Sequence, residues 1–379
     1  MRLFLALLLV TTACSSRAAL VPPVLDIAGS PAGCSPDRGP IRWFVPDAAV
    51  RTRLTAWCGS VGPPVVVTPS NRLQAAPDPD TLLVVSWNVG GGRGDVAALL
   101  ERLKASLDLS PSRVGLVLLL QEVVRGGRAV PPLPADLSNV PSALPAVDER
   151  QVESLAQRLG MWAFYVPSMR NGREDVAPLR QDRGNAILSN LPLTDLTAIE
   201  LPFGRQRRVA VAATVLHRGG RLPVRLVSFH LDTRGGRVAQ AGALAGYLAR
   251  DRARGLPVLA GGDVNSLFGT RDAAYRALAA ALPVADCGRA RTNSWPWRLH
   301  TWLGWWRGRL DYIFATPGSG LSLACRTLGD YGGSDHLPVV LRADLARPYK
   351  AGRGNVPRAS SYPAATRSSS LSPKARPIS

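Results

Sequence analysis

Asp263 and Asn265 are two reactive side chains that lie two residues apart in this 379-residue sequence. They follow the apolar run 258–260 and two glycines. The run predicts a buried strand, and the glycines allow a sharp turn after it. A carboxylate at such a strand end can take a proton from water, and a carboxamide can donate a hydrogen bond to an oxyanion. An Asx turn that merely ends the strand would give the same pattern.

Polar residues also occur at the ends of other apolar runs. They are Asn88, Glu122, His230, Asp232, Asp311, Ser334, Asp335 and His336. In layered α/β proteins the strand ends form a rigid edge with exposed loops, and chemistry concentrates there. Any one of these residues could be a turn residue or a buried, hydrogen-bonded group. Their recurrence at successive strand ends favours a shared site.

The spacing of apolar residues predicts the elements that position these side chains. Strands are expected at 82–87, 114–120, 163–166, 186–189, 209–216, 224–230, 258–260, 310–315, 321–325 and 338–342. Helices are expected at about 95–107, 148–160, 238–254 and 271–282, with Asp95 and Asp148 as N-caps and Gly160 ending the second. Alternating strands and helices give way to neighbouring strands. This order predicts mixed sheets stacked face to face, with helices outside, in one domain of about 265 residues.

Taken in order, these segments resemble the endonuclease/exonuclease/phosphatase superfamily, which has the DNase I-like fold. The most specific matches are Arg-Leu-Asp-Tyr-Ile-Phe at 309–314 and Ser-Asp-His-Leu-Pro at 334–338, and Gly184–Ser189 resembles an internal strand of the family. The resemblance spans about Leu82 to Leu341. It implies a four-layer α/β sandwich, in which two mixed, mainly antiparallel β-sheets pack face to face with helices on the outside.

The resemblance also implies a phosphoester hydrolase that uses a divalent metal, Mg²⁺ or Mn²⁺. By position, Glu122 would be the principal metal ligand, with Asn88 beside it and Asp335 contributing. His336 would contact and polarise the phosphate, and Asp311 would hold His336 in orientation.

Three further roles follow from the same resemblance. Asp263 would orient or deprotonate the attacking water, Asn265 would hydrogen-bond the phosphate, and His230 would contact the phosphoryl oxygens. Physical chemistry agrees, because hard oxygen ligands hold a cation against a phosphate and the developing charge needs hydrogen-bond donors. Arg183 and Arg208 either add positive charge near this site or are ordinary surface arginines.

The formal net charge of +19 fits a polyanionic partner, either a nucleic acid or an anionic membrane. Seven basic residues and no acidic residue follow Leu345, and arginine is abundant throughout, which also matches a biased genome composition. The charge therefore favours a nuclease without establishing one. The alternatives are a sphingomyelinase-like phospholipid phosphodiesterase, a phosphomonoesterase, and a non-catalytic anion-binding surface protein. The complete set of acidic and histidine positions argues against the last.

The amino terminus predicts export. An apolar run at 3–10, too short to span a bilayer, precedes Thr-Thr-Ala-Cys at 11–14. This resembles a lipoprotein signal, with residues 1–17 as signal peptide and Cys14 as a lipidation site that would anchor the protein to a membrane; an ordinary secretory signal is the alternative. The expected product is a monomer of the bacterial cell envelope, anchored or secreted.

Four cysteines remain besides Cys14. The sequence-local pairs are Cys34 with Cys58 and Cys287 with Cys325, although four cysteines allow three connectivities. None has the close spacing of a zinc site, so disulfides in an oxidising compartment are favoured.

Composition divides the rest of the chain. Residues 18–80 are expected to be a Pro/Gly-rich tether with a small subregion closed by cysteines, 81–346 the catalytic domain, and 347–379 a disordered basic tail. Five tryptophans lie within 294–309. They could form a membrane-binding tip, stack on bases, or pack under a loop.

Overall fold

The computed structural model describes most of the predicted catalytic domain and parts of the segment before it. The described residues are 19–20, 23–25, 41–45, 59–69, 79–107, 114–133, 148–172, 175–176, 179–204, 206–217, 222–233, 235–266, 268–283, 299–301, 304–306, 309–316, 321–329 and 332–344. All of them belong to one compact unit, Met1–Tyr349. The signal peptide, the basic tail and the tryptophan side chains of 294–309 lie outside the described residues, so the predictions for them stay predictions.

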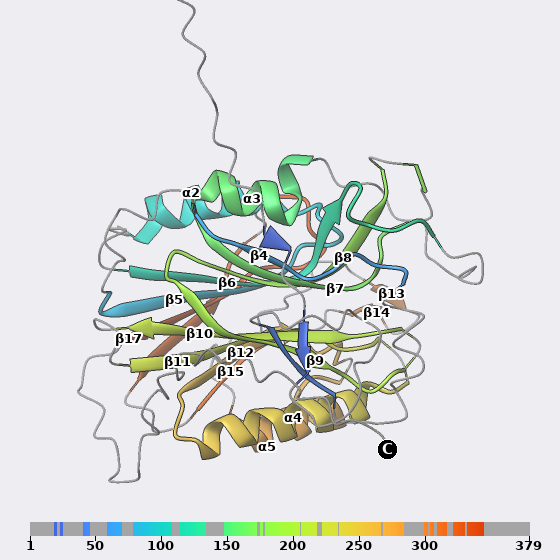
Figure 1. Ribbon diagram of the computed structural model, residues 1–379. Coiled ribbons are helices and arrows are strands. Elements are labelled where there is room, and N and C mark those ends of the chain that lie inside the picture. The colour runs from blue at the N-terminus through green and yellow to red at the C-terminus, as the bar shows by residue number, and fades with distance from the viewer. Residues whose placement is uncertain are drawn as a thin grey trace, which may run out of the picture. The chain divides into compact units, whose positions relative to one another are not determined.

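Two mixed sheets form the centre of this unit (Figure 1). The first contains, in order across the sheet, β1 (Ala19–Leu20), β4 (Val65–Val67), β7 (Trp162–Arg170), β8 (Gln181–Ser189), β6 (Val114–Gly126), β5 (Thr81–Asn88), β17 (Val339–Asp344) and β16 (Ser322–Thr327). The second contains β15 (Asp311–Ala315), β12 (Val258–Asp263), β11 (Leu222–His230), β10 (Val209–His217), β9 (Leu193–Glu200), β3 (Ile41–Phe44) and β2 (Pro23–Leu25). The strands β13 (Leu299–Thr301) and β14 (Gly304–Trp306) pair with each other.

Helices cover the outer face of each sheet. Figure 1 shows α2 (Val96–Leu107) and α3 (Val152–Leu159) over the first sheet, and α4 (Arg237–Ala253) and α5 (Ala273–Ala281) over the second. Short 3₁₀ turns, η1 (Asp148–Arg150) and η2 (Gly269–Arg271), precede α3 and α5. The layers are therefore helix, sheet, sheet and helix, which confirms the predicted four-layer α/β sandwich.

The alternation of side chains along β5 shows why the layers form. Leu82 and Val84 are buried between the two sheets, whereas Leu83 and Val85 are buried under the helices of the first sheet. Successive strand residues point to opposite faces, so a strand that is apolar at every position can be buried on both sides. Most strand pairs are antiparallel, but four are parallel: β5 with β6, β11 with β12, β2 with β3 and β3 with β9.

The observed helix ends agree only in part with the caps predicted from the sequence. The Asp95 carboxylate accepts a hydrogen bond from the Ala98 amide at 3.0 Å, as an N-cap does, and Gly160 ends α3 in the left-handed conformation. The predicted cap at Asp148 is wrong, because Asp148 begins η1 and α3 starts only at Val152. A 3₁₀ turn at a helix start satisfies the first amides without a capping side chain.

The predicted tether contributes strands to both sheets. β3 pairs with β9 at an edge of the second sheet, and β4 pairs with β7 in the first. Sequence patterning missed β3, β4 and β9, since short or polar strands gain their order from the neighbours they pair with. Cys325 on β16 is the only cysteine among the described residues, so both predicted disulfide pairings stay predictions.

Candidate active site

The strand ends of both sheets meet at the predicted site. In the second sheet, Asp263 at the end of β12 is paired with His230 on β11 and with Asp311 on β15. Asn88 ends β5 in the first sheet, and its side-chain Nδ2 donates to Asp263 Oδ2 at 3.1 Å. This hydrogen bond joins the two sheets at their polar edge. His336 enters from the loop before β17.

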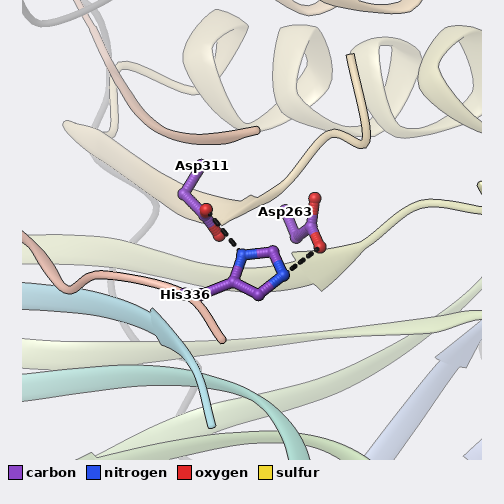
Figure 2. Close-up of side chains that lie close together, drawn as sticks. All are labelled: Asp263, Asp311 and His336. Carbon is purple, nitrogen blue, oxygen red and sulfur yellow. Dashed lines mark hydrogen bonds and ion pairs between the residues drawn. The ribbon is translucent and has the colours of Figure 1, made fainter. Parts of the chain in front are cut away.

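His336 lies between two buried carboxylates (Figure 2). Its Nδ1 is 2.8 Å from Asp311 Oδ2, and its Nε2 is 3.8 Å from Asp263 Oδ2. Burial alone would lower the pKa of His336, but the charges of Asp311 and Asp263 outweigh burial and raise it to about 10. The imidazole is therefore a cation at neutral pH, oriented by Asp311.

The Asp263 carboxylate contacts several other residues of the site. Its Oδ2 is also 3.3 Å from His230 Nε2, and its Oδ1 accepts the Asn265 amide at 2.8 Å. Burial raises the pKa of Asp263 to about 7, helped by the negative charge of Asp311 and opposed by His336 and the hydrogen bonds. A carboxylate with a pKa near neutrality is suited to accept a proton from water.

His230 differs from His336 in charge. Burial, followed by the positive charges of Arg208, His336 and Arg183, lowers the pKa of His230 well below its ordinary value. Its Nδ1 is 3.9 Å from Glu122 Oε1. At neutral pH the site thus holds one neutral and one protonated imidazole.

An irregularity in β6 sets the position of Glu122. The register against β8 shifts between Leu120 and Val123, and Glu122 has a φ of 56°. Left-handed backbone is costly for a residue with a Cβ, and such strain gathers at functional sites. Glu122 Oε2 is 3.3 Å from Arg183 Nη1, and the side chain is 23% exposed.

Asn265 also has left-handed backbone, with a φ of 53°. Its Nδ2 donates to the Leu231 carbonyl at 2.9 Å, and its own carbonyl accepts from Arg237 at 2.7 Å. These bonds fix the residue beside Asp263 and commit one amide hydrogen. The predicted contact between Asn265 and phosphate stays a prediction.

The loop that carries Asp335 and His336 is fastened to the end of β5. Ser334 Oγ donates to the Asn88 carbonyl at 2.6 Å, and Trp87 Nε1 donates to the His336 carbonyl at 2.9 Å. Asp335 Oδ1 forms an ion pair with Arg93 Nη2 at 3.0 Å. The sequence analysis did not identify Arg93, because nothing in its spacing sets it apart from other arginines.

The glycines after β5 leave space between the two predicted carboxylate ligands. A Cβ on Gly90 would lie 2.8 Å from Asp335 Oδ1, and a Cβ on Gly91 would lie 4.0 Å from Glu122 Oε2. The buried Asn171 presents its Oδ1 3.9 Å from that same Gly91 position. Oxygen atoms thus surround this loop, and sequence patterning gave no signal for Asn171.

Two groups of side chains could hold a metal ion. Asp263, Asp311 and His336 offer ligand atoms within 4.8 Å of one another. In that group, however, the two carboxylates already stabilise a proton on His336. The sequence-predicted ligands Asn88, Glu122 and Asp335 instead offer only oxygen atoms, which Mg²⁺ prefers. Glu122 and Asp335 are also part-exposed, at 23% and 31%.

The structure thus combines stacked mixed sheets, outer helices and an acid–histidine site at the strand ends. A sequence model of the Endonuclease/Exonuclease/phosphatase family matches residues 85–336, so the chain belongs to this family. The family includes nucleases, phosphatases and phosphodiesterases. No curated protein matches the chain.

Several solved structures are similar to this chain. One is the catalytic domain of human Nocturnin with bound sulfate, at 20% identity over 70% of this chain and 94% of that chain, with a TM-score of 0.47. An endonuclease/exonuclease/phosphatase from Beutenbergia cavernae has 22% identity, coverage of 70% and 72%, and a TM-score of 0.45. A mannosyl-6-phosphatase from Bacteroides thetaiotaomicron has 14% identity, coverage of 69% and 98%, and a TM-score of 0.44.

Proposed function

We propose that this protein is a divalent-metal-dependent phosphodiester hydrolase that acts on a nucleic acid or nucleotide. The observation that carries the proposal is the contact of Asp263 with both His336 and Asn88 at the joined ends of the two sheets. The proton acceptor is Asp263 itself, and its Oδ2 lies beside a cation, His336, and an amide donor, Asn88. Hydrolysis of a phosphodiester needs each of these groups.

Each of three residues has its own role in the proposed hydrolysis. Asp263, with a pKa of about 7, takes the proton from the attacking water. Protonated His336, held by Asp311, donates a hydrogen bond to a non-bridging phosphate oxygen and stabilises the charge that develops there. Neutral His230 contacts the same phosphoryl group from the side of Glu122.

Glu122, Asn88 and Asp335 would hold the metal ion, because they supply oxygen ligands, two of them part-exposed. When bound, Mg²⁺ or Mn²⁺ supplies Lewis-acid stabilisation of the phosphate. Glu122 and Asp335 are each paired with an arginine. Those arginines neutralise the carboxylates and keep them near the strand ends.

A first experiment separates an enzyme from a non-catalytic anion-binding protein. Purified protein is incubated with bis-p-nitrophenyl phosphate, plasmid DNA, RNA and sphingomyelin vesicles, with Mg²⁺ or with EDTA. We expect metal-dependent cleavage of a nucleic acid by the wild type and none by His336→Ala. Cleavage of sphingomyelin alone would favour the phospholipase alternative, and absence of all diester cleavage would refute the proposal.

Export to the cell envelope is a further part of the proposal. It rests on the apolar run and cysteine of residues 3–14. No helix in the described part of the chain is long and apolar enough to cross a bilayer. An intact-mass spectrum of the membrane fraction tests lipidation, because an unmodified mature amino terminus would exclude a lipid on Cys14.

A further inference from the structure

Two arginines, Arg183 and Arg208, lie beside Glu122 and His230. Arg183 Nη1 is 3.3 Å from Glu122 Oε2. Arg208 is buried, which lowers its pKa, and it lies within electrostatic range of Glu122 and Asp263, whose charges oppose that shift, and of His230. The two guanidinium groups therefore belong to the candidate site and are not ordinary surface arginines.

Both arginines have fixed positions, one on each sheet. Arg183 is on β8 of the first sheet, and Arg208 directly precedes β10 of the second. The Val209 amide donates to Ser168 Oγ at 3.3 Å, and the Val209 carbonyl accepts from Asn185 Nδ2 at 2.7 Å. These bonds tie the start of β10 to β7 and β8, so the two arginines are held on facing sheets.

Arg208 is incompletely satisfied despite its burial. Its residue is 7% exposed, Nη2 donates to Gln206 Oε1 at 3.3 Å, and Nε has no hydrogen-bond partner among the described residues. Burial lowers the pKa of Arg208, and the like charge of Arg183 lowers it further. A buried guanidinium with an unused donor is costly unless an anion binds to it.

A single scissile phosphate would not need these arginines. His336, Asn88 and the proposed metal ion already supply a cation, an amide donor and a Lewis acid for it. Guanidinium groups match phosphate oxygens in geometry and charge. Arg183 already bonds Glu122 through Nη1 and Met169 through Nη2. Arg208 therefore supplies the unused donor, and Arg183 adds positive charge, for a second anionic group of the substrate.

We propose that Arg183 and Arg208 form a subsite for a second phosphate, adjacent to the scissile diester of a nucleotide substrate. This inference rests on the proposed function and narrows its substrate class. A nucleic acid strand or a nucleoside bisphosphate carries such a neighbouring phosphate. A phosphocholine headgroup instead carries a quaternary ammonium, which two guanidinium groups would repel.

Two matched substrates test the subsite. Thymidine 5′-(p-nitrophenyl phosphate) contains one diester, and the same compound with a 3′-phosphate adds only the second anionic group. We expect the 3′-phosphate to raise kcat/KM of the wild type about 10- to 100-fold, the range for a charge-assisted hydrogen bond. The advantage is the ratio of the two kcat/KM values, so Arg208→Met and Arg183→Met should lose it even where they slow cleavage of both substrates.

The control is Arg254→Met, at the end of α4, whose side chain is 54% exposed and paired with Asp251. It removes the same charge from elsewhere on the protein and should keep the full advantage. Arg208→Gln replaces Arg208→Met if the latter fails to fold, as judged by circular dichroism. The subsite is refuted if the 3′-phosphate gives the wild type no advantage, or if the advantage survives in both arginine variants.

A binding measurement separates failure of this subsite from failure of the proposed function. Calorimetric titration with thymidine 3′,5′-bisphosphate and thymidine 5′-monophosphate requires no turnover. Tighter binding of the bisphosphate by wild type, and equal binding by Arg208→Met, supports the subsite even if neither substrate is cleaved. Equal affinity of the wild type for both nucleotides overturns the subsite, while metal-dependent cleavage would still support the hydrolase.

Discussion

His230 and His336 approach the same carboxylate oxygen, Asp263 Oδ2, at 3.3 and 3.8 Å, yet they carry different charges. Burial lowers the pKa of His336, but its bond to Asp311 and the charges of Asp311 and Asp263 outweigh burial and raise it to about 10. His230 faces Arg208 and Arg183, and its pKa is lowered, chiefly by burial. One carboxylate oxygen therefore receives both a neutral and a charged imidazole, so the two histidines can have separate roles.

The charge of His336 depends on Asp311. Asp311→Asn keeps the shape of the side chain and removes the charge, so the pKa of His336 should fall from about 10 toward its ordinary value. NMR titration of the imidazole measures this. Because His336 would then be less positive and less well oriented, kcat/KM at pH 7.5 should fall about 10²- to 10⁴-fold. An unchanged pKa would show that Asp311 does not hold the proton on His336.

The same shift predicts how the stability of metal-free protein depends on pH. The pKa of His336 is about 10 in the folded protein and 6.5 in the unfolded chain. A raised pKa means that the folded state binds the proton more tightly, so the stabilisation is complete below pH 6.5 and is lost as pH rises to about 10. Urea unfolding in EDTA should show this loss in the wild type, and a smaller loss in His336→Asn.

Activity should depend on the ionisation of Asp263. As the base, Asp263 must be deprotonated, so kcat/KM should rise as pH increases through about 7. It should fall again near pH 10 as His336 loses its proton. The comparison is Asp263→Glu, which retains a carboxylate in a shifted position and should keep an acidic limb at low activity. A flat profile between pH 5 and 8 would contradict the role of Asp263 as base.

Sequence patterning selected several residues that the structure brings together, because they stand at strand ends. Asn88, His230 and Asp263 each follow a run of apolar residues, so a strand assignment places them at one edge. The bulge that turns Glu122 toward the site could not be predicted, since it depends on a register shift between β6 and β8. The same holds for the ion pair of Asp335 with Arg93, which joins residues far apart in the chain.

Dependence on distant partners also explains why the sequence analysis missed strands β3 and β4. β3 and β4 lie in a segment rich in proline and glycine, where local preferences favour loops. They are strands because β9 and β7 offer unpaired edges to them. The long apolar strands β5 and β6, in contrast, carry enough hydrophobic pattern of their own to be recognised.

Asp182 should be one of the main structural anchors of the segment that contains β4. It accepts hydrogen bonds from the Gly62 amide and the Tyr165 hydroxyl, each at 2.8 Å, and pairs with buried Arg125. Asp182→Ala would leave the Arg125 charge buried without its partner. We expect a loss of about 3–5 kcal/mol in the free energy of unfolding, measured with urea. A loss below about 1 kcal/mol would show that Arg125 finds another partner or reaches water.

The glycine loop after β5 offers a matched pair of variants. Gly90 and Gly91 have φ values of 59° and 69°, so Gly90→Ala and Gly91→Ala should incur similar backbone strain, about 1–2 kcal/mol. Only Gly90→Ala also places a methyl group 2.8 Å from Asp335 Oδ1 and 2.9 Å from Arg93 Nη2. Gly90→Ala should therefore weaken Mn²⁺ binding, measured by electron paramagnetic resonance, much more than Gly91→Ala does. Equal Mn²⁺ affinities in the two variants would show that the position of Asp335 does not matter to the metal.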